Sequence, residues 1–380
     1  MTPSAPDPFA QLKFRDPARA RALADALARA VDAIGREVAV MHVCGSHEQA
    51  IARFGLRAVL PPGLKLIMGP GCPVCVTDGP EVDEAVALAL QGVRVCTYGD
   101  MIRLPGTSRS LADAQAAGGP VEIVYSVSQA VEIAAQHPGE EVVFLASGFE
   151  TTAVATAAVA LAGLPPNLSI LSVHKYVPAA MELVAAAKET HIEGYLAAGH
   201  AAIITGWAIF EPFARRTGAP VAVAGFEPLD ILAALVKVVD LIEERRPEVA
   251  NVYPRCVTRE GNLAAQRSLG KVFQVRDGRW RGIGEVPGGN LELTPAFAHL
   301  DARRRFRIDT AGVRDDDRAE EAQGCLCGSI MMGLATPADC PLFGKTCVPE
   351  APVGACMVSS EGQCRIWHTY GGMPDLRKVG

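Results

Sequence analysis

Short apolar runs rich in β-branched residues alternate with helical patterns from residue 38 to about residue 245. This alternation is typical of βαβ units, in which helices cover both faces of a parallel sheet. We therefore predict an α/β fold with strands near residues 38–43, 64–68, 93–98, 141–146, 169–173, 194–197 and 221–224. Ligands of such sheets bind beyond the carboxyl ends of the strands, so the loops that follow these strands are the best candidates for functional residues.

Glycine, proline and charged segments divide the chain into four predicted parts. Asp16-Pro17 and the apolar spacing after it predict a packing helix within residues 1–35. A candidate hinge at Gly118-Gly119-Pro120 separates a first α/β domain (36–118) from a second (119–245). We expect these two parallel-sheet domains to face each other across a cleft. The alternation weakens after residue 245, which predicts a smaller, irregular C-terminal domain over residues 246–380.

Composition excludes several classes of function. The chain of 380 residues is 49% hydrophobic and has a net charge of -6, so it is a globular protein without the basic surface that nucleic acids bind. Its N-terminus lacks the apolar core of a secretory signal, and its longest apolar stretch, Ala153 to Leu164, is too short to span a bilayer. We therefore expect a cytoplasmic protein. Structural disulfides are rare in that compartment, so eleven cysteines indicate metal binding or redox chemistry.

A Cys-x-x-Cys motif lies on a predicted strand-to-helix turn. Cys72 and Cys75 follow the apolar run at 64–68 and precede Pro80-Glu81, a typical helix start. Amides at the start of a helix favour thiolate, so this pair suits redox switching or a soft metal ion. A structural zinc half-site, or two inert buried thiols, are the simpler alternatives.

Other reactive residues also follow predicted strands. Cys44 and His47 come directly after the strand near 38–43, and Glu150 follows the strand near 141–146. The Glu150 carboxylate is placed either to hydrogen-bond a thiol or histidine at the cleft floor or simply to cap a helix. His174 and His200 follow later strands and are candidates to line the cleft. For two further cysteines, Cys96 and Cys256, we predict buried, unreactive thiols.

Six of the eleven cysteines lie between residues 325 and 364. Four of them, Cys325, Cys340, Cys347 and Cys364, are separated by fourteen, six and sixteen residues, and Cys327 and Cys356 remain. So many thiols without a histidine among them favour an iron-sulfur cluster over structural zinc, which more often shows C-x(2-4)-C pairs. The spacing alone leaves open whether Cys325 or Cys327 is the first ligand. Such a cluster would either transfer electrons or only stabilise this region.

Taken together, these motifs resemble the hydrogenase maturation factor HypD family over about residues 36–367. The resemblance rests on four segments: Cys44-Gly45-Ser46-His47-Glu48, the stretch 69–77, the stretch 147–152, and the series of C-terminal cysteines, here called the cysteine ladder, which includes residues 340–344 and 357–362. It implies a scaffold on which the Fe(CN)2CO unit of [NiFe] hydrogenase is assembled. It also implies a small HypC-like chaperone and a HypE-like cyanide donor as partners, and indirectly the precursor of the hydrogenase large subunit.

The resemblance also implies roles for individual residues. Cys44 corresponds to an iron ligand, and Cys72 and Cys75 correspond to a redox-active pair. A [4Fe-4S] cluster would be bound by Cys325, Cys340, Cys347 and Cys364, the four whose spacing matches the family, which selects against Cys327. The chain departs from the family pattern at 198–202, where the family has Gly-Pro-Gly-His, and at Asp78, where proline is common.

We hypothesise that Cys44 and a partner thiol hold the iron, while His47 donates a hydrogen bond to cyanide or carries protons. The simpler role for His47 is to cap the following helix. The alternative function is an iron-sulfur-dependent protein disulfide reductase, which would have no need of a third thiol at Cys44. The scaffold hypothesis requires the sulfurs of residues 44, 72 and 75 to meet at one sheet edge.

Overall fold

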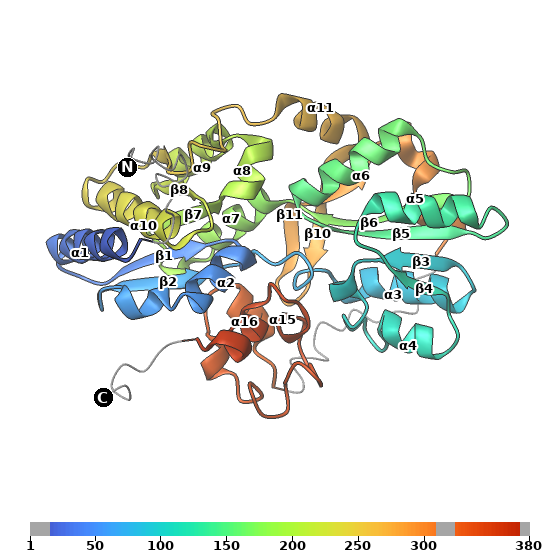
Figure 1. Cartoon of the computed structure of the whole chain (residues 1–380), viewed down its shortest axis with the longest axis horizontal. Helices are drawn as coiled ribbons and strands as arrows, with labels where there is room; N and C mark the ends of the chain where they lie inside the picture. Colours follow the sequence, from blue (N-terminus) through green and yellow to red (C-terminus); the bar gives the residue numbers. More distant parts are fainter. Residues whose placement is uncertain (1–15, 309–323, 373–380) are drawn as a thin grey trace, which may run out of the picture.

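The computed structural model describes residues 16–308 and 324–372 and has an α/β fold with two sheets, A and B (Figure 1). The α/β fold predicted from the alternation of strands and helices is confirmed. Sheet A contains parallel strands in the order β2-β1-β7-β8-β9. Its strands are β1 (Val38–His42), β2 (Leu64–Met68), β7 (Gly194–Ala198), β8 (Val221–Ala224) and β9 (Val249–Asn251). Every residue of β1, β7 and β8 is buried, as expected for a parallel sheet covered on both faces.

Sheet B is mixed, so the prediction of two parallel sheets is wrong for this one. Its order is β10-β11-β6-β5-β3-β4. Its strands are β3 (Arg94–Thr97), β4 (Val121–Ile123), β5 (Val142–Gly148), β6 (Leu168–Lys175), β10 (Phe273–Trp280) and β11 (Gly284–Leu293). Strands β3 to β6 are parallel, whereas β11 runs antiparallel to both β6 and β10.

Helices follow most of the parallel strands and cover the sheets (Figure 1). The α-helices are α1 (Pro17–Ile34), α2 (Gly45–Arg53), α3 (Gly79–Leu90), α4 (Leu111–Ala116), α5 (Val127–Gln136), α6 (Glu150–Ala162), α7 (Val177–Ala186), α8 (Gly199–Thr205), α9 (Glu211–Thr217), α10 (Pro228–Glu243), α11 (Leu263–Val272), α12 (Ala302–Phe306), α14 (Cys327–Met331), α15 (Ala355–Val358) and α16 (Gln363–Tyr370). Short 3₁₀ helices are η2 (Leu56–Val59), η3 (Gly99–Met101), η4 (Lys188–Thr190), η5 (Trp207–Phe210), η6 (Pro295–Leu300) and η7 (Pro337–Asp339).

The N-terminal helix forms as its sequence predicts. Asp16 caps α1 by accepting hydrogen bonds from the backbone N–H groups of Ala18 and Arg19, and Pro17 occupies the first turn. Gly35 ends the helix in the left-handed conformation that glycine favours. The buried face of α1, with Leu27 and Val31, joins the core under sheet A and packs against α10.

Neither sheet is built from one continuous stretch of chain. Strands β1 and β2 belong to the range 36–118, but they pair in sheet A with β7 and β8 from the range 119–245. Strands β3 and β4, also within or just after the first range, pair in sheet B with β5 and β6. The two sheets therefore do not follow the predicted ranges 36–118 and 119–245. Local patterning predicts β1 to β3 and β5 to β8 but not β4 or β9 to β11, and it does not specify which sheet the next strand joins.

Residues 249–293 do not form the irregular connection expected after residue 245. They contribute β9 to sheet A and the β10–β11 hairpin to sheet B. The hairpin is hard to recognise in sequence because its register shifts between Arg276 and Gly278, and because β11 contains Pro287-Gly288-Gly289. Bulges, glycine and proline are tolerated near a sheet edge, where fewer ladder hydrogen bonds are lost.

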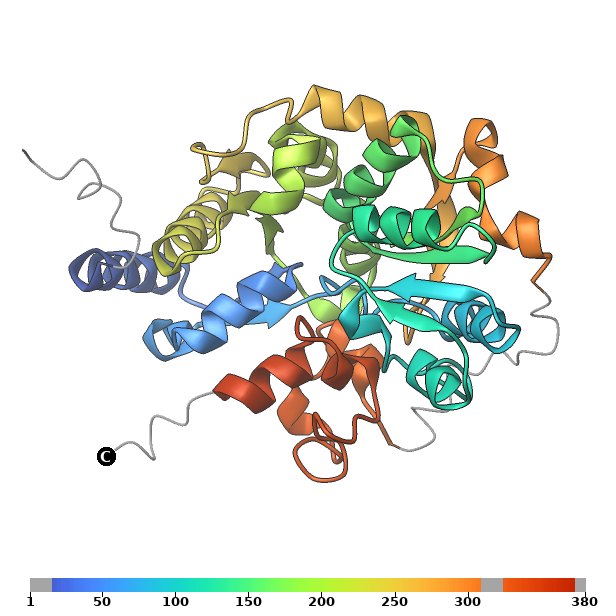
Figure 2. The same cartoon turned by 45° about the vertical axis from the view of Figure 1, so that its right-hand side comes forward.

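The C-terminal segment packs against both sheets at the carboxyl ends of their strands. In Figures 1 and 2, the red ribbon carrying α15 and α16 lies beside α2 and below the strands of both sheets. Helix α16 packs on α2. On the other side, Asp100 in η3 accepts hydrogen bonds from Ser359 and Ser360. The cysteine-rich segment is therefore joined to both halves of the molecule.

A buried ion pair links β6 to the start of α3. The Lys175 ammonium is fully buried and donates to both carboxylate oxygens of Glu81, at 2.9 and 2.8 Å, and to the side chain of Asn290 at 3.0 Å. Replacing Lys175 with methionine would leave the Glu81 carboxylate without its cation, so we expect the free energy of unfolding to fall by about 3–5 kcal/mol. Chemical denaturation measures this.

The matched control is Arg246→Met, which removes an exposed pair with Glu244 and Glu248. We expect that change to cost no more than about 1 kcal/mol. Equal losses from the two variants would show that the pair between Lys175 and Glu81 does not stabilise the fold as described.

Candidate functional site

Cys44 lies at the carboxyl end of β1, where it is the N-cap residue of α2. The nearby backbone N–H groups of Ser46 and His47 and the side chain of Ser46 favour its thiolate form. Burial nevertheless raises the pKa of the Cys44 thiol to about 12, and these polar groups only partly offset that rise. The thiol is therefore protonated at neutral pH, although its sulfur faces donors that would stabilise a thiolate.

The Cys-x-x-Cys loop packs directly on Cys44. The backbone of Gly71 lies against the backbone of Cys44, so closely that a side chain at position 71 would collide with it. The N–H of Gly45 also donates to the Gly71 carbonyl at 3.1 Å. Only glycine fits at position 71, which explains this residue within the motif. The structure thus brings the backbones of the first two cysteine motifs into contact, whereas the Cys44 side chain packs in a different cluster from those of Cys72 and Cys75.

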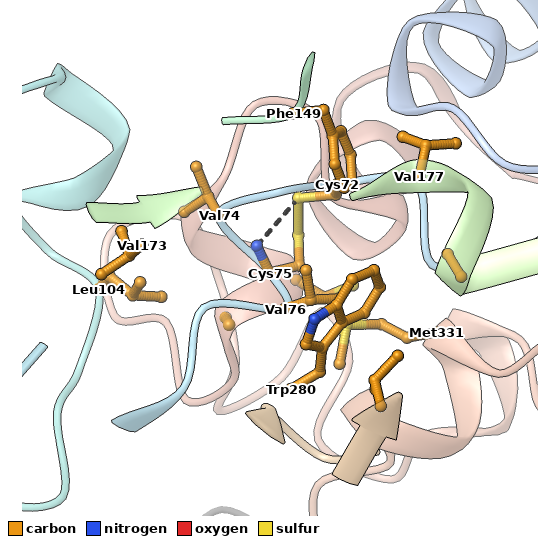
Figure 3. Close-up of a cluster of buried hydrophobic side chains, with 14 of the residues drawn as sticks. Cys72, Val74, Cys75, Val76, Leu104, Phe149, Val173, Val177, Trp280 and Met331 are labelled. Carbon is orange, nitrogen blue, oxygen red and sulfur yellow. Dashed lines mark hydrogen bonds between the residues drawn. A yellow bond between two sulfur atoms is a disulfide. The ribbon is translucent and has the colours of Figure 1, made fainter. Parts of the chain in front are cut away.

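Cys72 and Cys75 form a disulfide bond within this loop (Figure 3). Both residues are buried, and the N–H of Cys75 lies 3.1 Å from the Cys72 sulfur. Figure 3 shows Trp280 beside Val76, on the side of the loop that continues toward α3. Apolar side chains therefore hold the loop in place, and the disulfide lies where the chain crosses from sheet A to sheet B.

A cavity of about 310 Å³ reaches the surroundings of Cys44 through Ser46 and His200, which are among its lining residues, whereas the buried Cys44 is not. Ser46, His200 and Phe226 line it from the loops and helices that follow strands of sheet A, and Phe149, Thr151 and Thr152 from the start of α6, which follows a strand of sheet B. Pro73 of the disulfide loop and Glu361 of the C-terminal segment complete the lining. Its volume is within the range of small-ligand sites. The cavity at the carboxyl ends of the strands is therefore the candidate functional site, and it is where the predicted reactive loops meet.

His200 is a cavity residue that contacts this thiol. Its Nδ1 atom lies 4.0 Å from the Cys44 sulfur, and its ring packs against Phe226. Burial lowers the pKa of His200, which favours the neutral imidazole. Sequence reasoning placed His200 at a strand end but gave it no partner. The missing information was that β7 is the direct neighbour of β1, which places their following loops side by side.

The other two candidate histidines are fully buried. His47 Nε2 lies 3.0 Å from the Gly225 carbonyl, while Nδ1 has no hydrogen-bond partner among the described residues. Burial lowers the pKa of His47 to about 3, so the ring is neutral. His174 lies within β6, not after it, and contacts Thr156 and the Gly148 carbonyl. His174 is thus a core residue, and the expectation that it lines the cleft is wrong.

Glu150 begins α6 beside the cavity residues Phe149 and Thr151. One carboxylate oxygen accepts a hydrogen bond from the Val177 N–H at 2.9 Å, and the other has no partner in the described part of the chain. Burial raises the pKa of Glu150 from 4.5 to about 7. An unfolded chain would release this proton near pH 4.5, whereas the folded chain keeps it until about pH 7. Glu150 therefore lowers stability progressively as the pH rises through this interval.

We expect Glu150→Gln to remove this pH dependence. The wild-type free energy of unfolding should fall between pH 5 and pH 8 by an amount on the order of 3 kcal/mol more than that of the variant. Chemical denaturation at both pH values measures the difference. Glu182→Gln, which changes an exposed carboxylate, is the control, and a Glu150→Gln profile parallel to the wild-type one would contradict the assignment.

Glu48 joins the Cys44 helix to the cysteine-rich segment. Its carboxylate accepts hydrogen bonds from Trp367 at 2.6 Å and from Arg57 at 2.8 and 2.7 Å, and it contacts His42 at 2.9 Å. Burial alone would raise the pKa of Glu48, but Arg57 and His42 outweigh it and lower the pKa to about 2. Sequence reasoning assigned Glu48 no role, because its main partners lie on other elements.

Glu361 connects the same segment to the cavity. Its carboxylate accepts a hydrogen bond from Ser46 at 3.3 Å, and its backbone packs against Gly45. Glu361 precedes Cys364 by three residues, so the cavity wall and the cysteine cluster are parts of one short stretch. The C-terminal segment thus helps to form the site near Cys44.

The six C-terminal cysteines are all buried. Gly354 packs against Cys325 and Cys327, and the Cys356 N–H lies 3.4 Å from the Cys327 sulfur. A hydrogen bond with Cys356 lowers the pKa of Cys364, but burial and neighbouring thiols outweigh it and raise that pKa. Those neighbours include Cys325, Cys327 and Cys347, which shows that most of the ladder gathers in one place. The remaining one, Cys340, follows η7, which packs on α16.

Cys356 and Cys72 line the same small cavity, between the disulfide loop and the C-terminal segment. The ladder and the disulfide are therefore neighbours. Within residues 16–308 and 324–372, no group of three or more His, Cys, Asp or Glu side chains is placed so that it could hold a metal ion.

Cys256 is exposed, so its predicted burial is wrong, whereas Cys96 is buried in β3 as expected. No helix in the described part of the chain is both long and apolar enough to cross a bilayer.

Comparison with known proteins gives a consistent result. A family model described as "HypD: Hydrogenase formation hypA family" matches residues 18–371. The chain is 42% identical to the hydrogenase maturation factor HypD of Azotobacter vinelandii over 372 residues, covering 94% of this chain and 96% of that protein. The corresponding factor of Cupriavidus necator is 41% identical over 379 residues, with 97% and 98% covered. A putative hydrogenase expression/formation protein of Methanocaldococcus jannaschii is 38% identical over 351 residues, with 90% and 96% covered.

Proposed function

Because the chain belongs to the HypD family of hydrogenase maturation factors, we propose that it is a scaffold for assembling the Fe(CN)2CO unit of [NiFe] hydrogenase. The observation that carries this proposal is the junction at the sheet edge. Cys44, the Cys72–Cys75 disulfide loop and a cavity suited to a small ligand are in contact there. A stand-alone disulfide reductase would use the disulfide but has no need of Cys44 beside the cavity.

In this proposal the iron cargo binds to the Cys44 sulfur. A low-valent iron that carries cyanide and carbon monoxide favours soft thiolate ligands. The backbone N–H groups of Ser46 and His47 would stabilise the bound thiolate, since they lie near this sulfur and already lower the pKa of its thiol. His47 would also hold the start of α2 through its contact with the Gly225 carbonyl. A thiol from a HypC-like chaperone would complete the attachment of the iron.

The disulfide would supply or accept two electrons. Reduction of Cys72–Cys75 takes up two electrons and two protons and yields two thiols in the loop that packs on the Cys44 backbone. Since the loop carrying the disulfide is packed on the Cys44 backbone, a change in its redox state acts directly beside the cargo. Glu150, protonated near neutral pH, lies at the start of the helix that forms the opposite wall and would hold a proton there.

The donor set of the C-terminal ladder fits an iron-sulfur cluster, because it consists of buried cysteines gathered around Cys364 without an intervening histidine. We propose Cys325, Cys340, Cys347 and Cys364 as the ligands of a [4Fe-4S] cluster. When bound, such a cluster supplies one-electron transfer. Cys327 and Cys356 would remain as thiols, and Cys356 adjoins Cys72.

We further propose two α/β units that face each other across the cavity, each built around one sheet from separate stretches of chain. The segment 324–372 would be the cluster-bearing part, and α1 the packing helix of the first unit. The proposed setting is the cytoplasm, without nucleic acid or membrane as a partner. A HypC-like chaperone and a HypE-like cyanide donor would act directly, and the precursor of the hydrogenase large subunit indirectly.

The scaffold function is tested on protein purified anaerobically with the HypC-like chaperone. We expect infrared bands of iron-bound cyanide and carbonyl, together with iron in excess of the roughly four atoms per chain that one cluster holds. A disulfide reductase would show the cluster iron but none of these infrared bands. That result would overturn the proposal in favour of the alternative function.

The redox role of the disulfide is tested by thiol titration. Wild-type protein should lose two reactive thiols on mild oxidation and regain them on reduction. In the Cys72→Ser variant we expect neither loss nor recovery, because Cys75 has no partner within its loop. Cys256→Ser, which removes an exposed thiol, should lower both counts equally and keep the reversible change. An unchanged titration in Cys72→Ser would refute the redox role.

A further inference from the structure

The two walls of the cavity next to Cys44 differ in chemistry. On the sheet A side, the polar groups of Ser46 and His200 face the Cys44 sulfur or Glu361. On the sheet B side, the first turn of α6 presents Thr151 and Thr152. Neither of these threonine hydroxyls has a hydrogen-bond partner in the described part of the chain, although both line the cavity.

These hydroxyls contrast with the threonine one turn further along α6. Thr156 is buried, and its hydroxyl contacts His174 at 3.2 Å and the Thr152 carbonyl at 3.3 Å. Thr156 is thus satisfied within the protein. Thr151 and Thr152 instead offer two adjacent donors to whatever occupies the cavity.

We propose that Thr151 and Thr152 donate hydrogen bonds to the nitrogen atoms of the cyanide ligands on the iron. This inference rests on the proposed scaffold function. The Cys44 sulfur lies behind the lining residue His200, at 4.0 Å, so an iron attached to it would extend its diatomic ligands into the cavity, whose opposite wall is the start of α6. Cyanide binds iron through carbon and leaves a negatively polarised nitrogen outermost, which is a good acceptor for a hydroxyl donor.

The same arrangement distinguishes cyanide from carbon monoxide. The oxygen of an iron-bound carbonyl is a weak acceptor, so it gains little from the two hydroxyls. It is better accommodated beside the apolar rings of Phe149 and Phe226, which also line the cavity. A site built to hydrogen-bond one ligand discriminates against a ligand that cannot make the bonds, because its polar groups would then be left unpaired. Thr151 and Thr152 are therefore specificity-determining residues for the cyanide positions.

The test is infrared spectroscopy of the complex, purified anaerobically with the HypC-like chaperone, for the double variant Thr151→Val/Thr152→Val. Valine keeps the shape of threonine but removes the hydroxyl. We expect the cyanide bands to shift relative to wild type, while the carbonyl band shifts much less. Thr156→Val is the matched control on the same helix and should leave all bands in place.

Each outcome is informative. Unshifted cyanide bands in the double variant would overturn the inference, whereas the absence of bands from wild-type protein would refute the scaffold function instead. If the double valine variant loses all bands, the double serine variant decides, because serine restores both hydroxyls. Bands regained with serine support the hydrogen-bonding role, and bands still missing overturn it.

Discussion

The Cys44→Ala variant is expected to lose the infrared bands of iron-bound cyanide and carbonyl. In the wild-type protein the Cys44 sulfur lies 4.0 Å from Nδ1 of the cavity residue His200, at the start of α2. Removing a direct metal ligand should weaken iron binding by more than the roughly 10- to 100-fold that loss of an outer partner costs. Infrared spectra and iron content of the anaerobic complex measure the loss.

Cys96→Ala is the control, because this buried thiol lies in β3 of sheet B and outside the cavity. It should keep the bands. The visible absorption of the C-terminal cluster should persist in Cys44→Ala, which shows that the variant is folded. Full bands in Cys44→Ala would rule out Cys44 as the ligand of the iron cargo.

Replacing any one of the four proposed cluster ligands is expected to have the second large effect. Serine at position 325, 340, 347 or 364 should reduce bound iron and sulfide to a small fraction of the wild-type content. It should also destabilise the segment 324–372, since metal binding is coupled to folding where regular structure is sparse. Iron and sulfide analysis, with visible absorption, measures the cluster.

The serine variants of Cys327 and Cys356 are the matched controls, since both residues are buried in the same cluster of thiols. They should retain the [4Fe-4S] cluster. Loss of the cluster in Cys327→Ser, with retention in Cys325→Ser, would assign the first ligand to Cys327 instead. Equimolar zinc with no visible absorption would replace the iron-sulfur proposal altogether.

Local patterns predicted the elements of this fold well. The cap at Asp16 and the apolar spacing after it predict α1, and the strand ends predict where Cys44, the Cys72–Cys75 loop and the stretch 147–152 emerge. These features depend on neighbouring residues in the chain, which is why the sequence contains them.

Features that depend on distant residues could not be predicted. The chain crosses from one sheet to the other at several points, for example between β2 and β3 through the disulfide loop. No local sequence pattern indicates where these crossings occur, so the strands of each sheet could not be predicted. The contact between Glu48 and Trp367 joins residues far apart in the chain. The approach of His200 to Cys44 depends on β7 pairing with β1. The β10–β11 hairpin was missed because its glycines and proline imitate a loop.

The central claim is that the iron cargo is held by Cys44 in the cavity between the two sheets. Anomalous scattering at the iron absorption edge, from crystals of the anaerobic complex with the HypC-like chaperone, tests it most directly. We expect one site of iron density among the C-terminal cysteines and a second beside the Cys44 sulfur, facing Thr151 and Thr152. A cargo iron bound elsewhere, with the Cys44 cavity empty of iron, would contradict it.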